Sequence, residues 1–275
     1  MMRLGPSFYQ KILIIICSFI VNLNSAAILA DNWDEKRYEE QNDFDCTLQP
    51  ACFNFLAEIA NGEPIFQLGW FTATQGKSQH VDIEGLIGDD FEVNHSSDQN
   101  LLVGIGYYFN WLATSVVRMQ YGINAFYLGS TEVKGHVIQE DLFTNLSYRY
   151  SCTNYPIYFS AKALIPCGMC DDYDIVIDLG IGPNIVNTHS FKEKSLDGGI
   201  TIPDHIFSGK NTVVFSATAG LGWRINHIWE NHSLEIGYRF FYLGQGELKK
   251  VNNQVKNTLR TGNGYANALV ISISI

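Results

Sequence analysis

The chain has no run of 18 consecutive apolar residues, which is about the length that a helix needs to cross a bilayer. It is also short of basic residues, because 18 Lys and Arg stand against 28 Asp and Glu and give a formal net charge of −10. It contains no stripe of positive charge that could neutralise a row of phosphates. These shortages argue against helical membrane spans and against nucleic acid as a partner.

The first residues have the features of an export signal. Two basic residues precede Ile12 to Val21, an apolar run too short to span a membrane. Small residues follow, and cleavage after Ala26 or Ala27 fits them best, with Ala30 as an alternative. Cys17 allows a lipoprotein hypothesis, but a bulky residue precedes it where a small one is needed. We predict a signal peptide over residues 1–27.

The next segment is polar and acidic. Asp31 to Asp45 holds many acids and few bases, a composition typical of disorder. Gln49 to Gly62 is more apolar and could form one short helix before Pro64. We therefore expect residues 28–63 to be a short, partly disordered periplasmic extension, followed by one folded domain over residues 64–275.

Strict alternation of apolar and polar residues dominates this domain. From Ser233 to Leu243, every second side chain is large and apolar, while the residues between them include a carboxylate, a guanidinium and a glycine. Successive side chains of a strand point to opposite faces, so such a segment has one apolar face. Similar patterns predict strands over Ile65–Ala73, Asn100–Phe109, Val117–Tyr127, Leu142–Ile165, Asp174–Gly182, Val213–Arg224, Ser233–Leu243 and Tyr265–Ile275.

One of these segments is ambiguous. Leu142 to Ile165 could form two strands, which would bring the total to nine. Single-chain bacterial barrels have an even number of strands. We therefore interpret the segment as one long strand whose upper part projects beyond the membrane.

The identity of the two faces decides which one lies inside. One face is rich in Gly, Ala and Ser, and the other carries Leu, Ile, Val, Phe, Tyr and Trp. Eight strands enclose a lumen only wide enough for side chains to fill it. The bulky face must then contact lipid. The sequence predicts an all-β fold, an eight-stranded antiparallel up-and-down transmembrane β-barrel.

The expected connections alternate in length. Short turns are predicted near Asn110 and Trp111, at Pro166–Asp172 and at Asn226–Asn231, and long polar outer loops at Lys77–Gln99, Gly129–Asp141, Thr188–Gly209 and Glu247–Gly262. Short periplasmic turns and long outer loops are typical of outer-membrane barrels.

Several charged residues fall on the inward face. An unpaired charge in so narrow an interior would cost several kcal/mol, so we predict a paired ladder through the lumen. A gated ion path is the alternative to a purely structural ladder. The predicted network consists of Arg118, Lys162, Asp174, Asp178, Arg224, Glu235 and Arg239.

Cysteines form two close pairs. In an exported protein, Cys46 with Cys52 and Cys167 with Cys170 are disulfide candidates, and Cys152 is left over. The Cys-Gly-Met-Cys spacing of the second pair also occurs in thiol oxidoreductases, which need a helix start in a βαβ unit. Here it lies between two strand patterns, which favours a disulfide or free thiols.

Short motifs in the strands point to a family. Asp178 to Pro183 reads Asp-Leu-Gly-Ile-Gly-Pro, Ala219 to Trp223 reads Ala-Gly-Leu-Gly-Trp, and Tyr265 to Ile275 alternates to the last residue. On these motifs the chain resembles small outer-membrane β-barrels of the OmpA/OmpX-like "outer membrane protein beta-barrel" class. The resemblance implies location in the bacterial outer membrane, contact with its lipid and lipopolysaccharide, and recognition of the C-terminal strand by the barrel-assembly machinery. The family usually ends in Phe, and this chain ends in Ile.

Histidines in the predicted outer loops lie beside many carboxylates and could bind a divalent cation weakly. No pair has a tight ligand spacing, so a solvated surface is the simpler interpretation and no metal site is predicted. The loop histidines are His80, His95, His136, His189 and His205.

Catalysis is not expected. The one adjacent His-Ser pair, His232 and Ser233, lies at a predicted periplasmic turn without an evident acid partner. We predict no catalytic residues and no cofactor. The favoured hypothesis is a non-enzymatic barrel, structural or binding an extracellular ligand through its loops. A narrow pore or solute channel is the alternative, and a lipid-modifying hydrolase is a distant one.

Overall fold

The computed structural model describes residues 62–167, 172–229 and 232–274. The predicted signal peptide and nearly all of the predicted N-terminal extension lie outside these residues, as do Cys46, Cys52 and Cys170. In the part of the chain that is described, no helix is long or apolar enough to cross a membrane.

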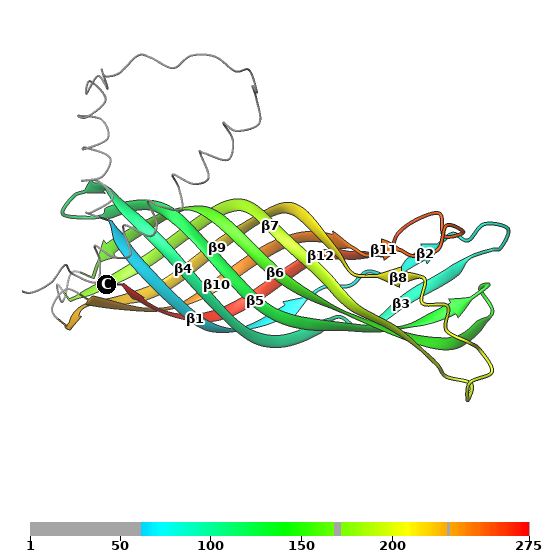
Figure 1. Cartoon of the computed structure of the whole chain (residues 1–275). Helices are drawn as coiled ribbons and strands as arrows, with labels where there is room; N and C mark the ends of the chain where they lie inside the picture. Colours follow the sequence, from blue (N-terminus) through cyan, green and yellow to red (C-terminus); the bar gives the residue numbers. More distant parts are fainter. Residues whose placement is uncertain (1–61, 168–171, 230–231, 275) are drawn as a thin grey trace, which may run out of the picture. The chain divides into compact units, whose positions relative to one another are not determined.

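Long antiparallel strands close into a ring (Figure 1). Each pairs with the next long strand in the chain, and the last pairs with the first. This ring confirms the predicted eight-stranded up-and-down barrel. Its strands are β1 (Glu63–Thr74), β4 (Ser97–Ala113), β5 (Arg118–Gln139), β6 (Phe143–Pro166), β7 (Tyr173–Ser195), β9 (Lys210–Trp229), β10 (His232–Glu247) and β12 (Arg260–Ser274).

Four short strands lie at the end of the barrel opposite to the C-terminal end of β12 (Figure 1). β2 (Gln79–Val81) pairs with β3 (Asp89–His95), and β3 continues the sheet by pairing with β5. β8 (Phe207–Ser208) pairs with β11 (Lys249–Lys250). A single bridge between Ile83 and Val255 connects the two groups. We call residues 76–96, 140–143, 196–209 and 248–259, which contain these short strands and the turn from β5 to β6, the cap.

The half of the barrel that contains the C-terminal end of β12, called the lower half from here on, presents apolar side chains to the outside. The half that carries the cap is called the upper half. Leu68, Phe159, Leu221 and Leu269 are 59%, 71%, 59% and 70% exposed. Two aromatic belts border this band. Tyr127 with Tyr155 and Tyr242 with Tyr265 form the upper belt, and Tyr107, Phe109 and Tyr121 form part of the lower one. A closed ring with such an exterior is suited to lipid, because it leaves no strand edge unpaired in the hydrocarbon.

The long strand β6 shows where the membrane ends. In its lower half the outward residues are apolar, with Ile157 43% exposed and Phe159 71% exposed. In its upper half the same outward parity carries polar residues such as Asn145 and Arg149, whereas Tyr148 on the inward parity is buried. The outward residues change from apolar to polar, although odd-numbered residues point outward in both halves. The strand therefore leaves lipid and enters water. This single strand with a projecting upper part confirms the sequence interpretation.

Three predicted outer loops are strands for much of their length. The predicted loop Lys77–Gln99 contains β2, β3 and the start of β4. β5 continues to Gln139 and β6 begins at Phe143, so the segment predicted as the loop Gly129–Asp141 is mainly strand. β7 likewise continues to Ser195, into the predicted loop Thr188–Gly209. These loop predictions were wrong because the strands were sought by their lipid-facing alternation. That alternation ends where the outer face becomes wet.

A bulge in β5 also conceals the continuing strand. The pairing with β6 shifts between Leu128 and Thr131, and the inward parity changes from even to odd residues. Before the bulge the even-numbered Leu128 points inward, and after it the odd-numbered Val133 and Val137 point inward. The predicted tight turn at Asn110 and Trp111 is displaced as well, because β4 runs to Ala113 and the turn occupies residues 114–117.

Two apolar cores lie inside the barrel, one above the other along the strands. The sequence predicted a lumen of small and charged residues and missed both. The core of the spanning half consists of Phe71, Ala73, Leu102, Phe126, Leu128, Tyr158, Phe241, Leu243, Ala266, Ala268 and Val270. The core of the projecting half joins β5 and β6 to the cap and consists of Val81, Phe91, Val133, Val137, Leu146, Tyr148, Tyr150, Cys152, Ile206, Phe207, Leu248, Val255 and Leu259.

Candidate functional site

Charged residues fill the lower lumen in pairs. Lys162 Nζ lies 2.9 and 3.0 Å from the two carboxylate oxygens of Glu235, and both residues are buried. Arg224 Nη1 lies 3.3 Å from Glu235 Oε1, and its other amino group pairs with Glu63. Arg118 pairs with Asp174 at the lower end. Two cations thus share Glu235 in a low-dielectric interior.

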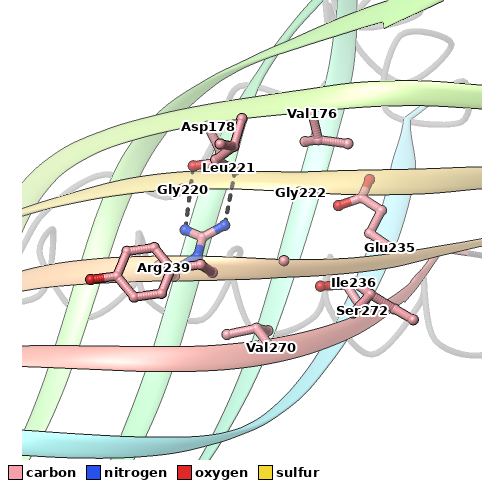
Figure 2. A pocket seen from close by; sticks show the side chains of 12 residues that line it. Val176, Asp178, Gly220, Leu221, Gly222, Glu235, Ile236, Arg239, Val270 and Ser272 are labelled. Atoms are coloured by element: carbon pink, nitrogen blue, oxygen red, sulfur yellow. Dashed lines mark hydrogen bonds and ion pairs between the residues drawn. The ribbon is translucent and has the colours of Figure 1, made fainter. Parts of the chain in front are cut away.

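A second layer lies above the first. Arg239 Nη2 donates to Asp178 at 3.1 Å, and the Tyr108 hydroxyl donates to the same carboxylate at 2.6 Å. Figure 2 shows the Arg239 guanidinium aimed at Asp178 across the lumen side of the wall. Lys162 Nζ lies 4.3 Å from the Tyr108 ring centroid, and Arg239 lies 5.2 Å from that of Phe126. These cation–π contacts connect the charged layers to each other and to the apolar layer above.

All seven charged residues of the predicted network lie on the inward side of the wall, and each has an ion-pair partner. The sequence interpretation missed an eighth member, Glu63. It stands before Pro64 and was assigned to the N-terminal extension, although it is the first residue of β1. With Glu63, four cations meet four anions, so the charges of the ladder balance. A lone acid directly before the first alternating segment was the signal that could have identified it.

Apolar and amide layers close the lumen above the ion pairs. The rings of Phe126 and Phe241 meet edge to face at 5.3 Å, and the Tyr158 hydroxyl bonds Ser216 at 2.6 Å. Still higher, Gln75 donates to Thr131 at 2.8 Å. The projecting apolar core follows. From the ion pairs upward, the lumen is therefore packed with side chains.

Two cavities lie along the described part of the lumen. The one beside Asp178 and Arg239 has a volume of about 30 Å³, enough for a water molecule or two. A larger cavity of about 370 Å³ lies at the lower end, between Arg118, Asp174, Arg224 and His227. It is a vestibule that leads up to the first layer of ion pairs.

The cap exposes large apolar side chains at its tips. Leu86 and Ile87, between β2 and β3, are 59% and 60% exposed, and Leu142 and Phe143, at the turn from β5 to β6, are 73% and 61% exposed. The Ile87 amide donates to Glu140 Oε2 at 3.3 Å, which holds the two turns together. We call these four residues the apolar tip.

Part of the cap between β7 and β8 lies against the start of β6. The Leu196 amide donates to the Asn145 carbonyl at 2.8 Å, and the Asn145 side chain donates to Thr201 at 2.9 Å. Ile200 and Ile202 of this segment are 85% and 76% exposed. The segment therefore adds further exposed apolar groups on an anchored backbone.

Of the cysteines, the structure describes Cys152 and Cys167, whereas Cys46, Cys52 and Cys170, the candidate partner of Cys167, lie outside the described residues. Both disulfides therefore stay predictions. Cys152 is free, and burial in the projecting core raises the pKa of its thiol to about 12. A thiol with such a pKa remains protonated and inert at neutral pH.

The His-Ser pair at the lower end does not form a catalytic arrangement. The Ser233 hydroxyl contacts the hydroxyl of Ser274, and His232 Nδ1 is buried without a hydrogen-bond partner within the described residues. A nucleophilic serine needs a base that accepts its proton.

The closed ring, its apolar exterior and its filled interior define a transmembrane β-barrel of the bacterial outer-membrane class. Neither a scan against protein-family models nor a search of curated proteins finds a match.

Solved structures of outer-membrane barrels are similar to this chain. OprG from Pseudomonas aeruginosa is 12% identical with a TM-score of 0.43, and the match covers 78% of this chain and 96% of that one. Neisserial surface protein A is 11% identical with a TM-score of 0.39 over the same shares. The attachment invasion locus protein Ail of Yersinia pestis is 11% identical with a TM-score of 0.30, over 78% of this chain and 99% of that one.

Proposed function

We propose that the chain is a non-enzymatic outer-membrane barrel that binds an extracellular ligand through its cap. The observation that carries this proposal is the apolar tip, four large exposed side chains on the β2–β3 loop and at the turn from β5 to β6. Exposed apolar groups gathered in this way are typical of interaction surfaces. The favoured ligand is therefore one with an apolar surface of its own.

The order of the cap supports binding. The β2–β3 hairpin is part of the barrel sheet through its pairing with β5, and Phe91 anchors it in the projecting core by ring contacts with Tyr148 at 5.1 Å and Phe207 at 5.7 Å. A surface that is ordered before binding loses less conformational entropy when a ligand arrives. The apolar tip is presented in this preorganised state.

The filled lumen makes the alternative, a pore, less favourable. Conduction would require the Arg239–Asp178 pair to separate and the aromatic layer of Phe126 and Phe241 to move. Buried ion pairs are costly to break, because each released charge remains in a medium of low dielectric constant. The lower vestibule supports only entry of solvent as far as the first ion pairs.

The proposal is tested by displaying the full chain on bacterial cells and measuring their adhesion to octyl-coated beads, with uncoated beads as reference. The double variant L142S/F143S should lower the adhesion at least threefold, because it removes half of the apolar tip. Val251→Ser is the matched control, since Val251 is 61% exposed in the cap but is not part of the tip.

Equal adhesion of the parent and the double variant would contradict the proposal, as would an equal loss in V251S. Folding of each variant is verified by its resistance to unfolding in cold detergent, seen as a shift in gel mobility.

A further inference from the structure

Three potential metal ligands meet in the cap, close to the apolar tip. His80 lies on β2, Asp90 on β3 and Asp141 in the turn between β5 and β6. One donor atom from each lies within 4.8 Å of the others. His80 Nδ1 is 2.8 Å from Asp90 Oδ1. The site is therefore small enough for one ion to contact all three residues.

The sheet fixes the positions of these residues. His80 is the direct cross-strand partner of Asp90 in the β2–β3 pair, and Asp90 is the partner of Ile138 in the β3–β5 pair. Asp141 follows three residues after Ile138, at the turn where the Glu140 amide donates to the Gly88 carbonyl at 3.1 Å. Three adjacent strands thus bring the donors together, and no loop movement is needed to assemble them.

The hydrogen bonds of the imidazole indicate what belongs between these groups. His80 Nε2 lies 3.1 Å from the carbonyl oxygen of Ile87, which can only accept, so Nε2 carries a hydrogen. In the neutral ring Nδ1 then has a lone pair, and it faces two carboxylates that also offer only lone pairs. Three electron-pair donors that converge in this way need a positive group among them, either a proton that His80 Nδ1 donates to Asp90 or a metal ion.

This arrangement is the one that metal-bound histidines commonly have. A ligating imidazole usually donates its second N–H to a backbone carbonyl or a carboxylate, which fixes the tautomer and the orientation of the ring. Here the Ile87 carbonyl has that position. Asp82, whose Oδ1 lies 3.7 Å from His80 Nε2, adds further negative charge on the other side of the ring.

We propose that His80, Asp90 and Asp141 bind one divalent transition-metal ion at the extracellular end of the barrel. One imidazole nitrogen and two carboxylate oxygens suit Zn²⁺, which accepts both donor types at about 2.0–2.2 Å. Three protein ligands leave a coordination position open, and the half-exposed site leaves it accessible to water or to a donor group of a ligand. The ion would also hold β2, β3 and the β5–β6 turn together.

The test is a calorimetric titration of Zn²⁺ into the full chain, folded in lipid nanodiscs and free of any histidine tag. We expect one site per chain, with binding weakened at least tenfold in H80A and in D141N. His136→Ala is the matched control, because His136 is another histidine at this end whose Nδ1 lies 2.7 Å from the Asn94 amide, outside the cluster. H136A should bind Zn²⁺ like the parent.

If H80A disturbs the β2–β3 hairpin, D141N still measures the contribution of the site to Zn²⁺ binding, because Asp141 is an exposed turn residue outside the strands. Absence of binding by the parent at about 1 mM Zn²⁺ would overturn the proposal, a dissociation constant at that level corresponding to only about −4 kcal/mol. Equal weakening in H136A would overturn it too. The adhesion assay on octyl-coated beads does not depend on this outcome, so the two proposals can fail separately.

Discussion

At the scale of single residues, the stability of the lumen depends on complete pairing of buried charges. Asp178 is 2% exposed and receives hydrogen bonds from Arg239 and Tyr108. The ladder could be foreseen from the sequence because charged residues recur on the inward parity of several strands. The partners within it could not, since they are set by strand register, and Glu63 was missed because it stands at the very start of β1.

Removal of Arg239 should therefore be costly. R239M leaves the Asp178 carboxylate buried without its cation, and we expect a loss of about 3–5 kcal/mol in the free energy of unfolding. Urea titration of the barrel in lipid vesicles, followed by tryptophan fluorescence, measures this loss. R149M is the matched control, because the Arg149–Glu132 pair is 52% and 28% exposed and such a pair contributes about 0–1 kcal/mol. Equal losses in the two variants would show that the lumen pair has no special role.

At the scale of elements, bulges decide which residues face inward where the barrel leaves the membrane. β10 has a register shift between Tyr242 and Gly244, and its inward parity changes there from odd to even residues. Strands in lipid could be predicted because their apolar residues alternate. The projecting parts of β5 and β7 could not be predicted in this way. Their outward residues are mostly polar, and the bulges shift the inward residues from even to odd positions, so the sequence there resembles a loop.

Gly244 is the residue that allows the bulge in β10. Its φ is +75°, and a Cβ atom there would lie 2.5 Å from Val214 Cγ2 and 2.6 Å from the Phe215 carbonyl oxygen. G244V should combine the cost of an unfavourable backbone, about 1–3 kcal/mol, with a steric clash. Gly199→Val is the control, since Gly199 also has a positive φ of +96° but no atom within 4 Å of its Cβ position. In the same urea titration G244V must lose clearly more stability than G199V, or the bulge does not depend on this glycine.

At the scale of the whole molecule, the barrel consists of a spanning half and a projecting half with opposite faces. β5, β6 and β7 contain 22, 24 and 23 residues, about twice the 9–11 that cross a bilayer. Lipid contacts the apolar outside of the lower half, and water contacts the polar outside of the upper half, whose core is apolar. The lower half anchors the molecule, and the upper half carries the cap away from the membrane surface.

In the proposed function, a filled barrel supports this cap and does not conduct. The most direct test is the conductance of the purified, folded chain in a planar lipid bilayer, with a porin as positive control. We predict no steady openings in the parent, and none in E235Q, because the layer of Phe126 and Phe241 closes the lumen above the ion pairs. Steady, reproducible openings of the parent whose conductance or selectivity changes in E235Q would contradict the account and identify the lumen as a pore.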